Sequence, residues 1–224
     1  MLKKLLFSAP RVSIFIYTLL LINQVNAQLQ PECGTVVSPE AETEFLKLLP
    51  KLEKDEIDFQ KHSSNLSSIN FVNYVPIKAH ILRQNDGSGG LTENQLNDAI
   101  AEMNIIYADA ELEFFLCGGI NYIDNTNYYN FSKSEEAELT NANNVDNTIN
   151  IYFANRVTSS TGSNLCGYAY FPGGPETIMM KNSCATNGST LSHEVGHFFA
   201  LSHTHGNSSQ TTELVDGSNC SGSG

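Results

Sequence analysis

Apolar and polar positions follow regular periods over most of the chain beyond its first third. Residues 74–82 alternate apolar and polar side chains, which predicts a β-strand in which Pro76 favours an early or edge position. Thr92 and Gln95 fit a capping box, and apolar residues then recur at helical spacing as far as Tyr107. Further apolar runs predict strands at residues 112–116, 148–154, 168–171 and 177–180.

A second helix is predicted near the end of the periodic region, with Ser189 or Thr190 as its N-cap. Leu191, Val195 and Phe198 follow at i, i+4 and i+7, so they form one helix face that packs on a sheet. The order of strand, helix, strands and helix contains no internal repeat. It predicts one α+β (α/β-like) domain, in which a twisted mixed sheet carries a backing helix and this second helix.

The first apolar run is different, because it follows basic residues at the N-terminus. Residues 12–22 are apolar, and the small residue Ala27 follows them. This pattern is typical of a secretory signal peptide of residues 1–27, so we expect a secreted, extracellular protein. A transmembrane anchor is the alternative, but the apolar run is too short to span a bilayer comfortably.

Residues 28–70 look unlike the rest of the chain. Residues 40–60 mix leucines with many charged side chains, and Pro50 is expected to interrupt any helix there. Residues 61–70 are polar and have the composition of a linker. A short helical piece followed by a tether is typical of a propeptide, and a ragged N-terminal extension is the alternative.

The net charge of the chain argues against some classes of binding partner. Without residues 1–27 the chain has nine basic and twenty-four acidic residues, a formal charge of −15. Such a surface repels a phosphate backbone, so nucleic acid is not expected as a partner. No later run is apolar enough to cross a membrane, so no stable membrane insertion is expected once the signal is removed. The oligomeric state cannot be read from these features.

Four of the six histidines lie within the stretch TLSHEVGHFFALSHTHG, residues 190–206. His193 and His197 are four residues apart, so on a helix their imidazoles share one face and can bind one zinc ion. Glu194 follows the first histidine, which completes the H-E-x-x-H arrangement in which the glutamate acts as general base. If these side chains merely packed in an apolar helix, they would lose hydrogen bonds to water without compensation.

A third ligand is expected from His203, ten residues after His193. In a continuous helix His203 would lie about 15 Å farther along the axis, beyond reach of the same ion. The helix must therefore end and the chain must turn back. Metal peptidases with H-E-x-x-H-x-x-G-x-x-H have a glycine at that turn.

HEVGHFFALSHTHG resembles the active-site helix of metzincin zinc metallopeptidases, and most closely their pappalysin and cytophagalysin branch. NIYF, GYAYFP and an early Cys-Gly-Thr extend the resemblance loosely over residues 31–206. It implies an N-terminal catalytic subdomain with His193, His197 and His203 as ligands of one catalytic Zn²⁺ and Glu194 as base and proton shuttle. It also implies a protein or peptide substrate added as a strand beside GYAYFP. Ca²⁺ is a candidate cofactor on the resemblance alone.

The chain departs from the metzincin pattern in two places. Ala200 stands where the family has glycine, which costs on the order of 1 kcal/mol if φ is positive there. The methionine-containing turn of the family follows the third histidine, but no methionine lies beyond His203. Residues 71–224 are therefore expected to form a catalytic domain whose C-terminal part is missing, in a fragment or a truncated gene product. A fragment of this kind can be inactive by itself.

Two other functions remain open. A gluzincin-type zinc peptidase would use an acidic third ligand, for which Glu213 or Asp216 is placed suitably in sequence. Substituting each acidic residue and His203 separately, and measuring zinc content, distinguishes the two classes. A secreted zinc-binding module without catalytic activity is the second alternative, and bound zinc without peptide cleavage would support it.

Five cysteines in an exported protein suggest disulfides with one cysteine left over. Three pairings are possible among Cys117, Cys166 and Cys184, and Cys166–Cys184 is the preferred one. Cys220 is expected to bond to a cysteine beyond the present end of the chain. Cys33 precedes the expected propeptide helix. Its thiolate is a good zinc ligand, so it could hold the fourth zinc position and keep the precursor latent. An ordinary disulfide or a free thiol is the alternative for Cys33.

Overall fold

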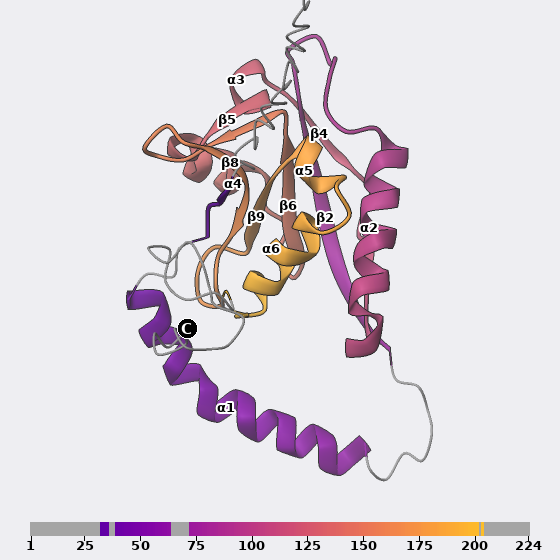
Figure 1. Ribbon diagram of the computed structural model, residues 1–224, viewed down its shortest axis with the longest axis vertical. Helices are drawn as coiled ribbons and strands as arrows, with labels where there is room; N and C mark the ends of the chain where they lie inside the picture. The colour runs from indigo at the N-terminus through magenta and orange to yellow at the C-terminus, as the bar shows by residue number, and fades with distance from the viewer. Residues whose placement is uncertain (1–31, 36–38, 64–71, 202, 204–224) are drawn as a thin grey trace, which may run out of the picture.

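A computed structural model describes residues 32–35, 39–63, 72–201 and 203 (Figure 1). Its strands are β1 (Glu32–Cys33), β2 (Asn73–Arg83), β3 (Leu112–Leu116), β4 (Asn121–Asp124), β5 (Asn130–Ser132), β6 (Ile149–Ala154), β7 (Arg156–Thr158), β8 (Asn164–Ala169) and β9 (Thr177–Lys181). Its α-helices are α1 (Pro39–Ser63), α2 (Glu93–Tyr107), α3 (Thr126–Tyr129), α4 (Glu136–Asn143), α5 (Asn182–Ala185) and α6 (Thr190–Phe198). Two 3₁₀ turns, Ala108–Ala110 and Lys133–Glu135, follow α2 and precede α4.

The strands form one mixed sheet in the order β3-β2-β6-β9-β8-β7-β5, with β4 also beside β2 and β1 also beside β8. Strand β8 is antiparallel to β7 and β9, whereas the other pairs are parallel. The expected α+β fold with a twisted mixed sheet and helices is confirmed. All five strands and both helices predicted from periodicity are present, although β8 begins four residues before the predicted Tyr168.

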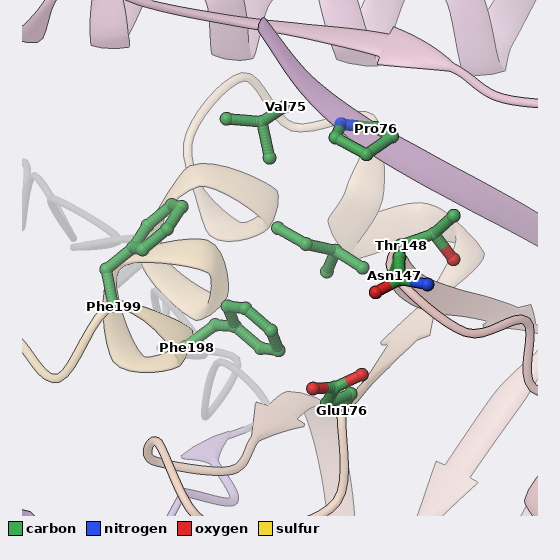
Figure 2. Close-up of a pocket in the computed structure, with 8 residues that line it drawn as sticks. Val75, Pro76, Asn147, Thr148, Glu176, Phe198 and Phe199 are labelled. Atoms are coloured by element: carbon green, nitrogen blue, oxygen red, sulfur yellow. The ribbon is translucent and has the colours of Figure 1, made fainter. Parts of the chain in front are cut away.

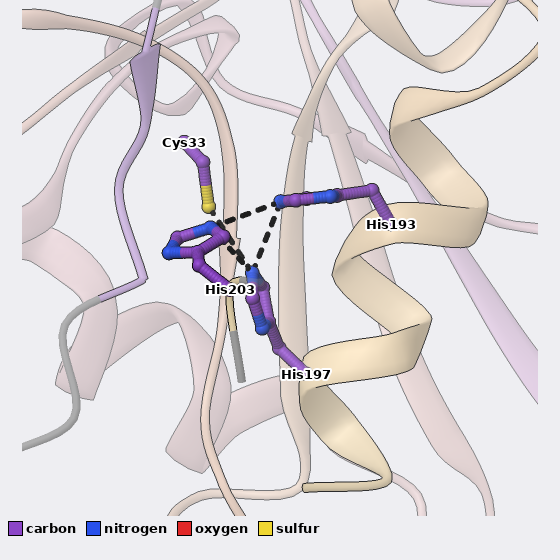
Figure 3. Close-up of side chains that lie close together, drawn as sticks. All are labelled: Cys33, His193, His197 and His203. Atoms are coloured by element: carbon purple, nitrogen blue, oxygen red, sulfur yellow. Dashed lines mark hydrogen bonds between the residues drawn. The ribbon is translucent and has the colours of Figure 1, made fainter. Parts of the chain in front are cut away.

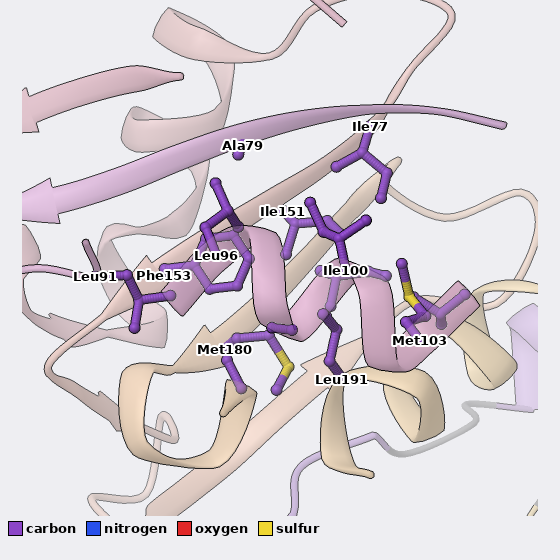
Figure 4. Packing of buried hydrophobic residues seen from close by; sticks show 14 of the residues in the cluster. Ile77, Ala79, Leu91, Leu96, Ile100, Met103, Ile151, Phe153, Met180 and Leu191 are labelled. Atoms are coloured by element: carbon purple, nitrogen blue, oxygen red, sulfur yellow. The ribbon is translucent and has the colours of Figure 1, made fainter. Parts of the chain in front are cut away.

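One face of the sheet carries both predicted helices. Apolar side chains of α2 and α6 pack against alternate residues of β2, β6 and β9, as Figure 4 shows for Leu96, Ile100 and Leu191. Leu191 and Val195 are almost fully buried, and Phe198 packs at the margin of the same cluster. The three residues that share a helix face by spacing therefore fix α6 on the sheet. Their packing also orients the other side chains of α6.

The other face of the sheet has a second core, in which Leu139 of α4 packs with Tyr152, Tyr168 and Met179 of the sheet. His80 is fully buried near this face and stacks on Tyr152 at 4.2 Å between ring centroids. Its two ring nitrogens lie within hydrogen-bonding distance of Asn150 and Asn121. Burial lowers the pKa of His80 to about 4, so this histidine is a neutral, fully hydrogen-bonded core residue.

Helix α1 contradicts the expectation that Pro50 interrupts any helix in this segment. The helix is continuous through Pro50, which forgoes the one hydrogen bond that its missing N–H would make to the Leu46 carbonyl. Leu46 is 55% exposed, so water can satisfy that carbonyl. Glutamate, lysine and leucine on both sides of Pro50 are strong helix formers, which favours the continuous helix.

The Asn-rich region after Cys117 contains β4, α3, β5 and α4, none of which was predicted. The expected signal peptide and most of the expected linker lie outside the described residues. Within the described ranges, no helix combines the length and the apolar character needed to cross a membrane.

Candidate active site

Helix α6 begins at Thr190, and its N-cap is Ser189, one of the two residues predicted for this position. Ser189 occupies the N-cap position without a capping side-chain hydrogen bond. The Asn187 side chain takes this role, because its Oδ1 accepts from the backbone N–H groups of Ser189 and Thr190 at 3.1 and 2.9 Å. Tyr107 of α2 also donates to the Ser192 carbonyl at 2.9 Å, which fixes the first turn of α6.

Four side chains from three segments converge beside α6 (Figure 3). His193 and His197 project from successive turns of the helix, and His203 returns from the chain beyond it. The three Nε2 atoms lie 3.0, 3.0 and 3.2 Å from one another. Cys33 approaches from β1, with its Sγ 3.5 Å from the Nε2 of His197. The donor atoms of the three expected ligands and of Cys33, the expected latency residue, therefore lie within 4.8 Å of one another.

The turn that returns His203 to the helix is a Schellman motif. Leu201 N–H donates to the Gly196 carbonyl, and Ala200 N–H donates to the His197 carbonyl, both at 2.9 Å. This motif needs a residue with positive φ after the helix, and Ala200 has φ 69°. Alanine thus occupies a position that favours glycine, and the turn is formed nevertheless.

Replacing Ala200 by glycine is expected to stabilise the domain by about 1 kcal/mol, because glycine adopts positive φ without a steric cost. For a domain of this size the melting temperature should rise by about 2–4 °C, measured by thermal unfolding. Ala137→Gly in α4 is the control, since glycine in an ordinary helix should lower the melting temperature. A lower melting temperature for Ala200→Gly would contradict the assignment of strain to this turn.

The distances suit a zinc ion. Around a tetrahedral Zn²⁺, two imidazole nitrogens should lie about 3.3 Å apart, and a nitrogen and a thiolate sulfur about 3.6 Å apart. The nitrogens here lie at 3.0–3.2 Å, and the Cys33–His197 distance is 3.5 Å. His197 Nδ1 lies 2.7 Å from the Leu201 carbonyl, the contact that fixes a ring with Nε2 turned toward a metal. The donor set fits zinc.

The ionisation of the site also suits a cation. Burial lowers the pKa of His197, which favours the neutral imidazole that binds metals. Burial, and then the neighbouring Glu194 carboxylate, raise the pKa of the Cys33 thiol to about 12. A divalent cation among the imidazoles would lower the pKa of the Cys33 thiol and so favour the thiolate.

Glu194 is fully buried beside this cluster. Burial raises the pKa of its carboxyl to about 7, and hydrogen bonds with Cys33 and Thr35 lower it in part. Oε2 accepts from the Thr35 hydroxyl at 3.0 Å, whereas Oε1 has no hydrogen-bond partner among the described residues. A buried carboxylate that has one oxygen without a hydrogen-bond partner and a pKa near neutrality has the properties of a general base.

Gly167 of β8 gives Glu194 the space it occupies. A Cβ at this position would lie 2.8 Å from the Met179 carbonyl and 3.1 Å from Glu194 Cγ. The Gly167 carbonyl accepts from Gly34 N–H at 2.7 Å, so the same residue holds the segment that carries Cys33. Any larger residue here would clash with the Met179 carbonyl of β9 and displace the Glu194 side chain.

A disulfide and an aromatic stack support the site from the side. The preferred Cys166–Cys184 pair forms a disulfide, which ties β8 to α5 immediately before α6. Such a cross-link, closing a sequence separation of 18 residues, contributes about 3 kcal/mol in the loop-entropy account. Phe171 stacks on His197 and is itself met edge-on by Phe45 of α1.

A separate hollow of about 200 Å³ lies at the end of α6 (Figure 2). Phe198 and Phe199 line one side, and Val75, Pro76 and Glu176 lie across from them. None of the four converging side chains lines this hollow.

Of the residues singled out from sequence, His193, Glu194, His197, His203 and Cys33 come together. Glu213, Asp216 and Cys220 lie outside the described residues. Thr35, Gly167 and Phe171 also contribute to the site but were not assigned a role. Thr35 belongs to the quoted Cys-Gly-Thr, and Gly167 and Phe171 belong to the quoted GYAYFP, so these motifs carried the only signal for them.

Comparison with known proteins points to extracellular metalloproteases, although no model of a known protein family matches the chain. Extracellular metalloproteases of Arthroderma benhamiae and Trichophyton verrucosum are each 29% identical over 196 residues, covering 79% of this chain and 66% of theirs. One from Podospora anserina is 30% identical over 151 residues, covering 58% of this chain and 50% of its own. The chain thus spans between half and two thirds of these relatives.

Solved structures give weaker likenesses. Promirolysin of Tannerella forsythia superposes with a TM-score of 0.49 at 20% identity, covering 77% of this chain and 69% of its own. Mature mirolysin in complex with a cleaved peptide gives 0.48 at 22% identity, covering 61% and 66%. The sequence relatives alone make the chain similar to extracellular metalloproteases over most of its length.

Proposed function

We propose that this chain is the latent precursor of a secreted zinc endopeptidase that hydrolyses peptide bonds of protein substrates. The observation that carries the proposal is the meeting of three imidazole Nε2 atoms within 3.2 Å of one another beside the buried Glu194. The similarity to extracellular metalloproteases supports it, as does the secretory pattern of residues 1–27. The motif flanks further favour the pappalysin-like branch of the metzincins.

In this proposal His193, His197 and His203 hold the zinc ion. When bound, the ion would act as a Lewis acid toward the scissile carbonyl and would make a water nucleophilic near neutral pH. Glu194 accepts the proton of that water at its carboxylate and delivers it to the leaving amine. Its burial excludes bulk water from the proton being transferred, and its unpartnered Oε1 can accept the proton without breaking a hydrogen bond.

The substrate would lie along β8. In the structure β1 pairs with β8 through Glu32–Leu165 and Cys33–Gly167, so the N-terminal segment covers this edge. A peptide can add to a free strand edge by main-chain hydrogen bonds. The precursor would therefore be latent in two respects, because Cys33 takes the fourth ligand position and β1 covers the peptide-binding edge.

Zinc content tests the ligand assignment. The purified precursor is expected to bind one zinc ion per chain, measured by atomic emission after dialysis. His203→Ala should lose most of this zinc, because three remaining donors include the displaceable Cys33. Glu213→Gln and Asp216→Asn should keep it, and they serve as matched controls for the gluzincin alternative. Retention of zinc by His203→Ala together with its loss in either acidic variant would contradict the proposal.

Peptide hydrolysis separates the enzyme from a silent zinc-binding module. After removal of the N-terminal segment, the zinc-loaded chain should cleave an unfolded protein substrate, and a zinc chelator should stop the cleavage. Full zinc occupancy without cleavage in the processed chain would favour the silent module.

A further inference from the structure

The segment Cys33-Gly34-Thr35, here called the strap, crosses the site and is held there by side-chain contacts and by a backbone hydrogen bond. Cys33 meets the imidazoles, and Gly34 N–H donates to the Gly167 carbonyl at 2.7 Å. Thr35 lies deeper than Cys33 and Gly34, with 9% of its surface exposed. A hydroxyl this deeply buried requires hydrogen-bond partners, and it finds them on both sides of the site.

The Thr35 hydroxyl links Glu194 to strand β8. Oγ1 lies 3.0 Å from Glu194 Oε2 and 3.3 Å from the Ala169 carbonyl, and it accepts from Ala169 N–H at 2.9 Å. A hydroxyl has one proton to donate. The carboxylate is both closer and charged, so it takes this proton in preference to the carbonyl.

We propose that Thr35 is a second lock of the strap, which acts on Glu194 and on the strand edge rather than on the metal. Its hydroxyl holds Glu194 Oε2 and at the same time occupies the Ala169 N–H. This inference rests on the proposed latency, but it assigns a positioning role to a residue outside the ligand set. Removal of the strap would release the Glu194 carboxylate and the Ala169 N–H of β8 in one step.

The two locks should be separable although Cys33 and Thr35 both contact the Glu194 carboxylate. Only the Cys33 thiol also meets the imidazoles, and only the Thr35 hydroxyl also bonds to Ala169 of β8. Loss of the Thr35 hydroxyl should therefore loosen the strap even when all four metal-site donors are intact. Valine is the suitable replacement, since it keeps the shape of threonine and removes only the hydroxyl.

The test measures how fast Cys33 is alkylated by iodoacetamide in the zinc-loaded precursor, with the labelled peptide resolved by mass spectrometry. Thr35→Val should raise the labelling rate about tenfold or more, as expected for loss of a buried hydrogen bond to a charged group. Thr35→Ser keeps the hydroxyl and should change the rate less than about threefold. Thr140→Val, which removes another buried hydroxyl whose hydrogen bond lies within α4, should leave the rate unchanged.

A double-mutant cycle with Glu194→Ala identifies the partner. If the hydroxyl acts through the carboxylate, Thr35→Val should add less than about threefold to the labelling rate in the Glu194→Ala chain. An undiminished effect there, or a parental labelling rate for Thr35→Val alone, would overturn the inference. Labelling requires no peptide hydrolysis, so failure of this lock and failure of the proposed peptidase activity give different results.

Discussion

Glu194→Gln is expected to abolish peptide hydrolysis by the processed chain while leaving its zinc in place. Glutamine has nearly the shape of glutamate and can still accept from Thr35, but it cannot take up a proton at neutral pH. Loss of a general base costs about 10²–10⁴-fold in rate. The measurement is the initial rate of cleavage of a fluorogenic peptide, at equal zinc content, for the variant and its parent.

Glu113→Gln is the matched control, because Glu113 is an exposed glutamate of β3 on a strand remote from β8. It should retain the parental rate. If Glu194→Gln loses its zinc, the carboxylate supports the metal site itself, and the assignment as base is wrong. Unchanged hydrolysis at unchanged zinc content would contradict the mechanism directly.

The pair His193 and His197 could be placed from the sequence because their geometry is local. Four residues make about one turn of a helix, so the spacing alone puts both imidazoles on one face. The need for His203 to return also follows from helix geometry. The turn that accomplishes the return depends on the backbone of Gly196 to Leu201, and the sequence signal for it was blurred because Ala200 replaces glycine.

Thr35 and Gly167 could not be given roles from the sequence because their contacts join distant parts of the chain. Thr35 meets Glu194 across 159 positions, through the pairing of β1 with β8. Strand β1 has only two residues, too few for any periodic pattern. The same limit explains why β4, β5 and β7 were missed, since each is short and lies among polar residues.

Pro50 shows the opposite failure, in which a strong local rule gave the wrong result. Proline removes one helical hydrogen bond and prefers an extended residue before it. In α1 the surrounding helix formers and the exposure of the affected turn outweigh this cost. The rule that proline ends a helix is therefore less reliable where the helix is exposed to water, because water can bond to the carbonyl that proline leaves unpaired.

Cys33→Ser is expected to give the unprocessed precursor measurable peptidase activity. A serine hydroxyl is a far poorer zinc ligand than a thiolate, so the fourth position should open to water. We expect the unprocessed variant to cleave a peptide about tenfold or more faster than the unprocessed parent. It should remain slower than the processed parent, because Thr35 and the β1–β8 pairing still hold the strap over the strand edge.

Cys117→Ser is the matched control, since Cys117 is the other free cysteine of the described residues and lies outside the ligand cluster. It should stay latent. Cobalt substitution provides a second readout, because a thiolate bound to Co²⁺ gives a charge-transfer absorption band that Cys33→Ser should lose and Cys117→Ser should keep. If the unprocessed Cys33→Ser chain is no more active than its parent while the processed parent is active, the thiol does not enforce latency, and the strap must act through its strand pairing and Thr35 alone.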